Sequence, residues 1–172
     1  MRIVVVGTSG SGKSTLAAAL AQRLHCPHLE LDALYWGPDW TPRSQADFIA
    51  AVDAASRGER WVADGNYSPV RELLWGRASH VIWLNYPLPL PLWRVCRRTL
   101  SRVLRHQPLW GGNRETLRRA LLSRDSILLW ALTSHGKNRS RYAALHGSRQ
   151  FPHLQWLELR RPMGLDAVLR RL

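Results

Sequence analysis

The apolar positions of the chain fall into short continuous runs that are separated by segments with helical spacing. The runs that predict strands are Arg2–Val6, His28–Asp32, Trp61–Asp64, His80–Asn85 and Leu154–Leu159. The first of them is β-branched and ends in a glycine, which is typical of a strand buried on both faces of a parallel sheet.

The segments between these runs predict helices. Ser14–Leu24 has leucines four residues apart on one face, and Thr41 followed by Pro42 is typical of a helix N-terminus, with Gly58 as its end. Further helices are expected from Ser68, over Leu88–Arg105, from Asn113 to about Leu132, and over Leu165–Leu172. Strands that alternate with helices predict a three-layer α/β fold, and the length predicts a single domain, residues 1–172.

The clearest chemical signal lies between the first strand and the first helix. The segment reads Gly7-Thr8-Ser9-Gly10-Ser11-Gly12-Lys13-Ser14-Thr15 and fits G-x-x-x-x-G-K-[ST] at every fixed position. Its glycines let successive backbone N–H groups surround a phosphate, and the helix N-terminus adds partial positive charge. We therefore predict an ATP site in which Lys13 reaches the β- and γ-phosphates and the Ser14 hydroxyl binds Mg²⁺.

Two predicted strands end in a carboxylate. Asp64 closes one of them and is a candidate for holding Mg²⁺ through its water shell, with a capping role in a turn as the alternative. Asp32 closes another and is a candidate for contact with a second substrate, because α/β sheets bind ligands at the carboxyl ends of their strands. A local capping role is the alternative for Asp32 as well.

The charge of the chain favours anionic partners. Lys and Arg number 25 against 12 Asp and Glu, so the formal net charge is +13, and the stretch from Arg94 to Arg141 supplies +10 of it. On the predicted helix Leu88–Arg105 the arginines share one broad face, which is either a solvated surface or a set of groups that close over transferring phosphate. We name Arg98 on this helix, Arg114 beyond it, and one of Arg139 or Arg141 as the candidates for that contact.

The remaining composition narrows the class of protein. No apolar run approaches the length of a membrane span, and Cys26 and Cys96 match no metal or redox spacing. We therefore expect a cytoplasmic protein with reduced thiols.

Several motifs together resemble the adenylate-kinase-like P-loop proteins of the FlaR type, also called topology modulation proteins. The resemblance rests on GTSGSGKST, ELDALYWGPDW, WVADGNYS, VIWLNYP, GGNRETLRR and RDSILLWAL, and covers Met1 to about Tyr142. It implies a five-stranded parallel sheet of order 2-3-1-4-5, an acceptor-binding helical insert at 33–58, and an Arg-bearing lid with its following helix at about 104–141.

The resemblance also implies roles for single residues. Asp64-Gly65 matches the Asp-Gly at the end of strand three in adenylate kinases, and Arg71 lies a few positions after their following arginine. Asp32 is similar to the acid that shikimate and gluconate kinases place near the acceptor hydroxyl, where it takes a proton. Asn85 stands where the family commonly has Asp, which leaves Asp64 as the leading carboxylate for the metal.

These observations predict a kinase that uses Mg²⁺ and ATP and phosphorylates a small acceptor: a nucleoside, a nucleotide or a small hydroxy compound. Tyr35, Trp36 and Trp40 line the acceptor pocket in this hypothesis, or else pack under the insert. The alternative is a regulator that binds nucleic acid through its arginines and uses ATP as a switch. That alternative is not favoured, because the sequence shows no recognition module. A bare ATPase or GTPase is a third interpretation, which the sequence favours less.

Overall fold

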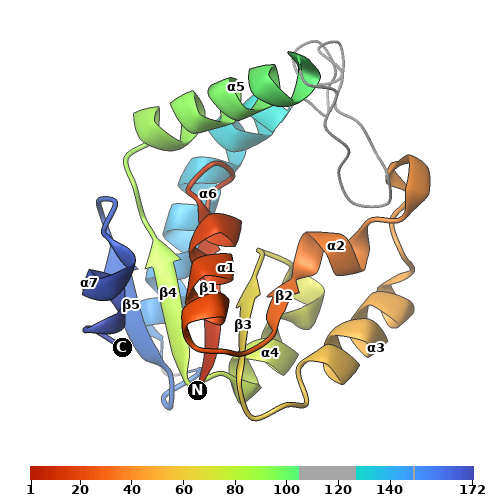
Figure 1. Ribbon diagram of the computed structural model, residues 1–172, viewed down its shortest axis with the longest axis vertical. Helices are drawn as coiled ribbons and strands as arrows, with labels where there is room; N and C mark the ends of the chain where they lie inside the picture. The colour runs from red at the N-terminus through yellow and green to blue at the C-terminus, as the bar shows by residue number, and fades with distance from the viewer. Residues whose placement is uncertain (105–126, 149) are drawn as a thin grey trace.

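The computed structural model of the chain describes residues 1–104, 127–148 and 150–172 (Figure 1). Its strands form one parallel sheet in the order β2-β3-β1-β4-β5, as the resemblance implies. The strands are β1 (Arg2–Gly7), β2 (His28–Glu30), β3 (Trp61–Asp64), β4 (His80–Leu84) and β5 (Gln155–Leu159). The predicted three-layer α/β class is therefore confirmed.

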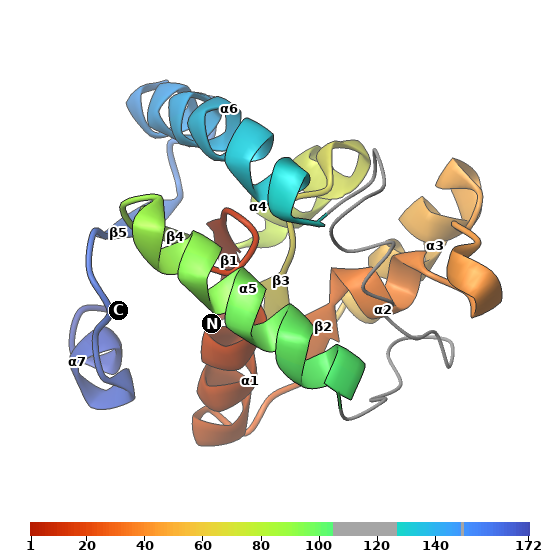
Figure 2. The same cartoon turned by 90° about the horizontal axis from the view of Figure 1, so that it is seen from above.

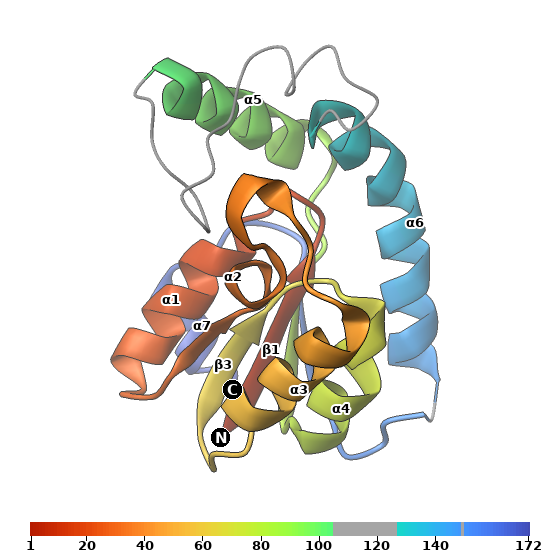
Figure 3. The same cartoon turned by 90° about the vertical axis from the view of Figure 1, so that its right-hand side faces the viewer.

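Helices cover both faces of this sheet (Figure 3). The helices are α1 (Lys13–Arg23), α2 (Leu31–Tyr35), α3 (Gln45–Ala55), α4 (Arg71–Arg77), α5 (Pro89–Leu104), α6 (Ile127–Gly147) and α7 (Leu165–Leu169), with 3₁₀ turns at Pro38–Trp40 and Ser68–Val70. One face carries α1 and α7, and the other carries α3, α4 and α6. Helix α5 lies across the carboxyl end of the sheet (Figures 1 and 2).

The central strand shows why both faces must be covered. Val4 and Val6 pack into the cluster under α3, α4 and α6, whereas Ile3 and Val5 pack into the cluster under α1 and α7. All four side chains are at most 1% exposed. Full burial of such side chains stabilises the fold by about 1.5–3 kcal/mol each, so neither helical layer is dispensable.

Several expected boundaries are wrong. β2 ends at Glu30, so Asp32 is not a strand residue but the second residue of α2. The helix expected from Thr41 begins later, because the Ser44 hydroxyl accepts a hydrogen bond from the Asp47 N–H at 3.1 Å and caps α3 at Gln45.

The last third of the chain departs from its expected boundaries as well. The helix expected to end near Leu132 continues, since α6 runs to Gly147, whereas its expected start at Asn113 lies outside the described residues. The closing helix is shorter than expected and ends at Leu169. Among the helices of the described residues, none combines the length and apolar content that a membrane span requires.

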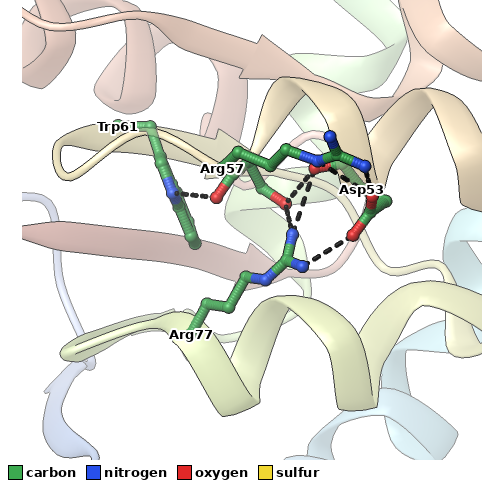
Figure 4. A network of polar contacts seen from close by, with 5 residues as sticks. Asp53, Arg57, Trp61 and Arg77 are labelled. Carbon is green, nitrogen blue, oxygen red and sulfur yellow. Dashed lines mark hydrogen bonds and ion pairs between the residues drawn. The ribbon is translucent and has the colours of Figure 1, made fainter.

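A polar network joins α3 to α4 (Figure 4). Arg77 on α4 donates to Asp53 Oδ1 at 2.6 Å and to Ser56 Oγ at 2.8 Å, and Arg57 donates to Asp53 Oδ2 at 2.7 Å. The buried Trp61 of β3 completes the junction by donating from its indole to the Ser56 carbonyl at 3.0 Å. The network therefore fixes the end of α3 to the sheet and to α4.

The first prediction concerns the pH dependence of this network. Hydrogen bonds from Arg57 and then Arg77 hold the pKa of Asp53 below its ordinary value of 3.8. The stabilisation is thus present above about pH 4 and is lost as the pH falls through the lower pKa of the folded state. We expect Asp53→Asn to be less stable than the wild type at pH 7, and the difference to shrink at pH 3.

Urea unfolding at both pH values measures this difference. The matched control is Asp166→Asn, at an exposed position of α7, which should show little difference at either pH. A stability gap for Asp53→Asn that stays constant from pH 7 to pH 3 would contradict the role of the network.

Candidate active site

The phosphate-binding loop connects β1 to α1 at the carboxyl edge of the sheet. No side chain caps α1 in this described segment, because Gly12 occupies the N-cap position and the first turn carries no acidic residue. The first N–H groups of α1 therefore remain available to a phosphate, together with the positive end of the helix dipole. This geometry fits the triphosphate of ATP.

Helix α5 packs against the phosphate-binding loop. Arg94 donates from Nη1 to the Ser11 carbonyl at 3.0 Å. Gly10 has a φ of +78°, and a Cβ at this position would lie 2.5 Å from Val95 Cγ2 and would also overlap the Pro91 carbonyl. Glycine is required at this position both by backbone conformation and by the close approach of the helix.

Lys13 interacts electrostatically with three of the other candidate residues. Its ammonium donates to the Thr8 carbonyl at 3.2 Å, which folds the side chain back over the loop. Burial lowers the pKa of Lys13, the carboxylates of Asp32 and Asp64 oppose that shift, and Arg98 adds to it. Both acidic candidates and Arg98 therefore lie within electrostatic range of Lys13.

Asp64 is buried and held on both sides. Its Oδ2 accepts from the Ser14 hydroxyl at 2.6 Å, and its Oδ1 lies 2.7 Å from His28 Nε2. Only 3% of the Asp64 side chain is exposed, so the carboxylate is fixed rather than solvated. A hydroxyl and a carboxylate side by side next to a phosphate loop form an oxygen donor set that fits Mg²⁺.

Asp32 lies at the start of α2 and is bound to a tyrosine. The Tyr67 hydroxyl donates to Asp32 Oδ1 at 2.6 Å. Burial, followed by the charge of Asp32, raises the pKa of Tyr67 well above its ordinary range, so this hydroxyl stays protonated and keeps donating. The second oxygen of Asp32 thus has a fixed direction.

Aromatic rings surround this pair. Tyr35 contacts Tyr67 at 4.8 Å and Trp36 at 4.9 Å between ring centroids, and Trp36 contacts Trp40 at 5.7 Å. Tyr35, Trp36 and Trp40 are each half-buried. They pack on one another next to Asp32, which is consistent with both of the roles considered for them from the sequence.

The other candidates are placed as follows. Arg98 lies on α5, whereas Arg114 lies outside the described residues. Arg71 begins α4, where its guanidinium lies 5.8 Å from the centre of the Trp75 ring. Asn85 donates to Glu158 Oε1 of β5 at 2.6 Å and is thereby directed to the neighbouring strand.

Sequence reasoning missed some of the residues that shape this site. Tyr67 follows Asp64-Gly65 closely, so its place after a strand end was a usable signal. His28 gave no such signal, because its contact with Asp64 depends on the parallel pairing of β2 with β3, in which His28 lies opposite Val62.

Sequence comparisons match the chain to one protein family and to individual relatives. The model of the AAA domain family matches residues 3–157. The uncharacterized protein YqaC of Bacillus subtilis (strain 168) is 29% identical over 114 residues, which make up 65% of this chain and 64% of YqaC. A shikimate kinase of Cereibacter sphaeroides is 28% identical over 145 residues, covering 73% of this chain and 68% of that enzyme. The chain thus matches a little under two thirds of YqaC.

Solved structures share the fold at low sequence identity. A shikimate kinase from Acinetobacter baumannii, in complex with shikimate, superimposes with a TM-score of 0.58 at 18% identity over 98% of this chain and 90% of that one. A gluconokinase from Sinorhizobium meliloti 1021 gives 0.51 at 19% identity, over 99% and 87%. These similarities confirm the architecture of the sheet and its flanking helices.

The second prediction tests the close approach of α5 to the loop. Gly10→Ala introduces a Cβ that overlaps Pro91 and Val95 at a φ that alanine rarely adopts. We expect it to weaken ATP binding by at least about tenfold, which calorimetry measures, and to lower the midpoint of thermal unfolding. The matched control is Gly76→Ala in α4, where nothing lies within 4 Å of the added Cβ. Equal ATP affinity in the two variants would refute the argument.

Proposed function

The chain belongs to the AAA domain family, and we propose that it is a P-loop kinase that transfers the γ-phosphoryl group of ATP to a hydroxyl of a small molecule. One observation carries this proposal: a phosphate loop, a hydroxyl bonded to a buried carboxylate, and a second carboxylate meet around Lys13. The kinases among the relatives and structural neighbours support it. The more specific relation to FlaR-type proteins and a cytoplasmic location remain part of the proposal.

The loop and its neighbours bind and polarise the phosphates. Backbone N–H groups between Thr8 and Thr15, beyond the Gly7 N–H that donates to Asn66, are proposed to surround the β-phosphate, and Lys13 places its ammonium against the β- and γ-phosphate oxygens. Ser14 and Asp64 would hold Mg²⁺, which neutralises charge on the same oxygens. Arg98 and Arg114 are proposed to stabilise the charge that spreads over the transferring group.

Asp32 is proposed as the general base. It accepts the proton of the acceptor hydroxyl while the acceptor oxygen bonds to the γ-phosphorus and the bond from that phosphorus to the bridging oxygen breaks, leaving ADP. Tyr67 keeps one Asp32 oxygen occupied, so that the other faces the acceptor. The insert at 33–58 supplies Tyr35, Trp36 and Trp40 as an apolar wall for the acceptor, which favours a ring-shaped hydroxy compound or a nucleoside.

We do not propose nucleic-acid binding as the function. That alternative was based on the arginine-rich stretch, but Arg94, the first arginine of the stretch, donates to the Ser11 carbonyl of the phosphate loop. At least this arginine therefore contributes to the nucleotide site.

The third prediction concerns Lys13. Lys13→Ala should abolish phosphoryl transfer, because it removes the ammonium that folds over the loop and that we assign to the β- and γ-phosphate oxygens. The measurement is the release of ADP coupled to the appearance of phosphorylated product, in a screen of nucleosides, nucleoside monophosphates and small hydroxy acids. Lys137→Ala, an exposed lysine on α6, is the matched control and should keep full activity. Transfer by Lys13→Ala at the wild-type rate would exclude the proposed role.

The fourth prediction concerns Asp32. Asp32→Asn removes the base but keeps the shape, so turnover of a hydroxyl acceptor should fall by about 10²–10⁴-fold while background ATP hydrolysis changes much less. Asp53→Asn is the control for a lost carboxylate that affects only stability. Equal losses of transfer and hydrolysis in Asp32→Asn would remove Asp32 from the acceptor site.

A further inference from the structure

The strand that delivers Asp64 leaves the sheet immediately after it. β3 pairs with β1 from Arg2 opposite Trp61 to Val5 opposite Asp64. The chain then turns at Gly65, whose φ is +145° and where a Cβ would lie 2.9 Å from Leu31 Cβ. Backbone pairing with β1 therefore stops before β1 reaches its last residue, Gly7.

Beyond Asp64, the side-chain amide of Asn66 forms the hydrogen bonds to β1 that backbone groups of β3 form up to that point. Gly7 and Asn66 are separated by 59 residues, the same separation as Val5 and Asp64. Asn66 Nδ2 donates to the Gly7 carbonyl at 2.6 Å, and the Gly7 N–H donates to Asn66 Oδ1 at 3.4 Å. The side-chain amide thus takes the place of a peptide group and satisfies both polar atoms of the first residue of the phosphate loop.

A tyrosine 76 residues further along the chain fixes this amide. The Tyr142 hydroxyl on α6 donates to Asn66 Oδ1 at 2.8 Å. Tyr142 is 1% exposed, and its ring stacks on Trp75 with 6.3 Å between centroids. Burial raises the pKa of Tyr142 to about 12, although Arg71 and Arg141 act against the shift. The hydroxyl therefore keeps its proton at neutral pH, so it can donate to Asn66 Oδ1.

We propose that Asn66 and Tyr142 are positioning residues that connect α6 to the first peptide of the phosphate loop and so set the affinity for ATP. The part of this proposal that concerns ATP rests on the proposed function. The loop is held at two points: α5 contacts it at Gly10 and Ser11, and the Tyr142–Asn66 chain holds it at Gly7. Helices α5 and α6 also contact each other, so the two helices that hold the loop are packed together.

Loss of the Tyr142–Asn66 bond should weaken ATP binding less than loss of the Asn66 side chain. Tyr142→Phe removes one hydroxyl and leaves the ring stack, so Asn66 keeps its bonds to Gly7 but loses its fixed orientation. Asn66→Ala removes every link. We expect the Kd for Mg·ATP to rise about 3- to 10-fold in Tyr142→Phe and more in Asn66→Ala.

The fifth prediction is that the two substitutions act through a single chain of contacts. In a double-mutant cycle, Tyr142→Phe combined with Asn66→Ala should weaken ATP binding no further than Asn66→Ala alone. Calorimetry with Mg·ATP measures the affinities. The control is Trp156→Phe, which disturbs the same core cluster, since Trp156 contacts Trp75 at 5.4 Å, but leaves the hydroxyl in place. It should lower thermal stability and keep the wild-type Kd.

A second readout does not need ATP at all. Hydrogen exchange of the free protein should speed up at the amides of Gly7 and Thr8 in Tyr142→Phe and Asn66→Ala, but not in β4 or in Trp156→Phe. Exchange rates at Gly7 and Thr8 that match the wild type, or additive losses in the cycle, would overturn the proposal. If the wild type binds no ATP, the proposed function fails, while faster exchange at Gly7 still supports the positioning role.

Discussion

The parallel pairing of β1 with β3 on one side and β4 on the other is the constraint on which the molecule depends. Because all three strands run in one direction, their carboxyl ends meet at one edge of the sheet. The phosphate loop, Asp64 and Asn85 are thereby brought to that edge from distant parts of the sequence. Such pairing requires a long crossover after each strand, and those crossovers are the helices that bury the sheet on both faces.

The fold could be predicted from the sequence to the extent that local patterns determine it. The apolar runs of β1, β3 and β4 identify their own strands, and the loop motif defines the start of α1 within one residue. Other boundaries depend on competition between neighbours. Thr41-Pro42 and Ser44 are both suitable helix starts, and the bond from the Ser44 hydroxyl to the Asp47 N–H decides between them.

In the candidate site, too, local sequence patterns predicted some residues, whereas others depend on tertiary contacts. The loop motif predicted Lys13 and Ser14, and the end of an apolar strand predicted Asp64; the structure brings the three residues into contact or electrostatic range. The partners of those residues depend on tertiary pairing. His28 approaches Asp64 only through the β2–β3 register, and Tyr142 approaches Asn66 only because α6 packs back over the sheet. A linear pattern carries no trace of contacts between residues that are so far apart in the chain.

The near absence of lysine has a practical consequence for the study of this protein. Arginine carries almost all of the positive charge, so Lys13, Lys137 and the amino terminus are the only primary amines in the sequence. Since burial lowers the pKa of Lys13, a larger share of its amine is unprotonated and nucleophilic than an ordinary lysine offers. Acylating reagents therefore have few competing targets, and the modification of Lys13, as distinct from Lys137 and the amino terminus, reports on whether the loop is covered.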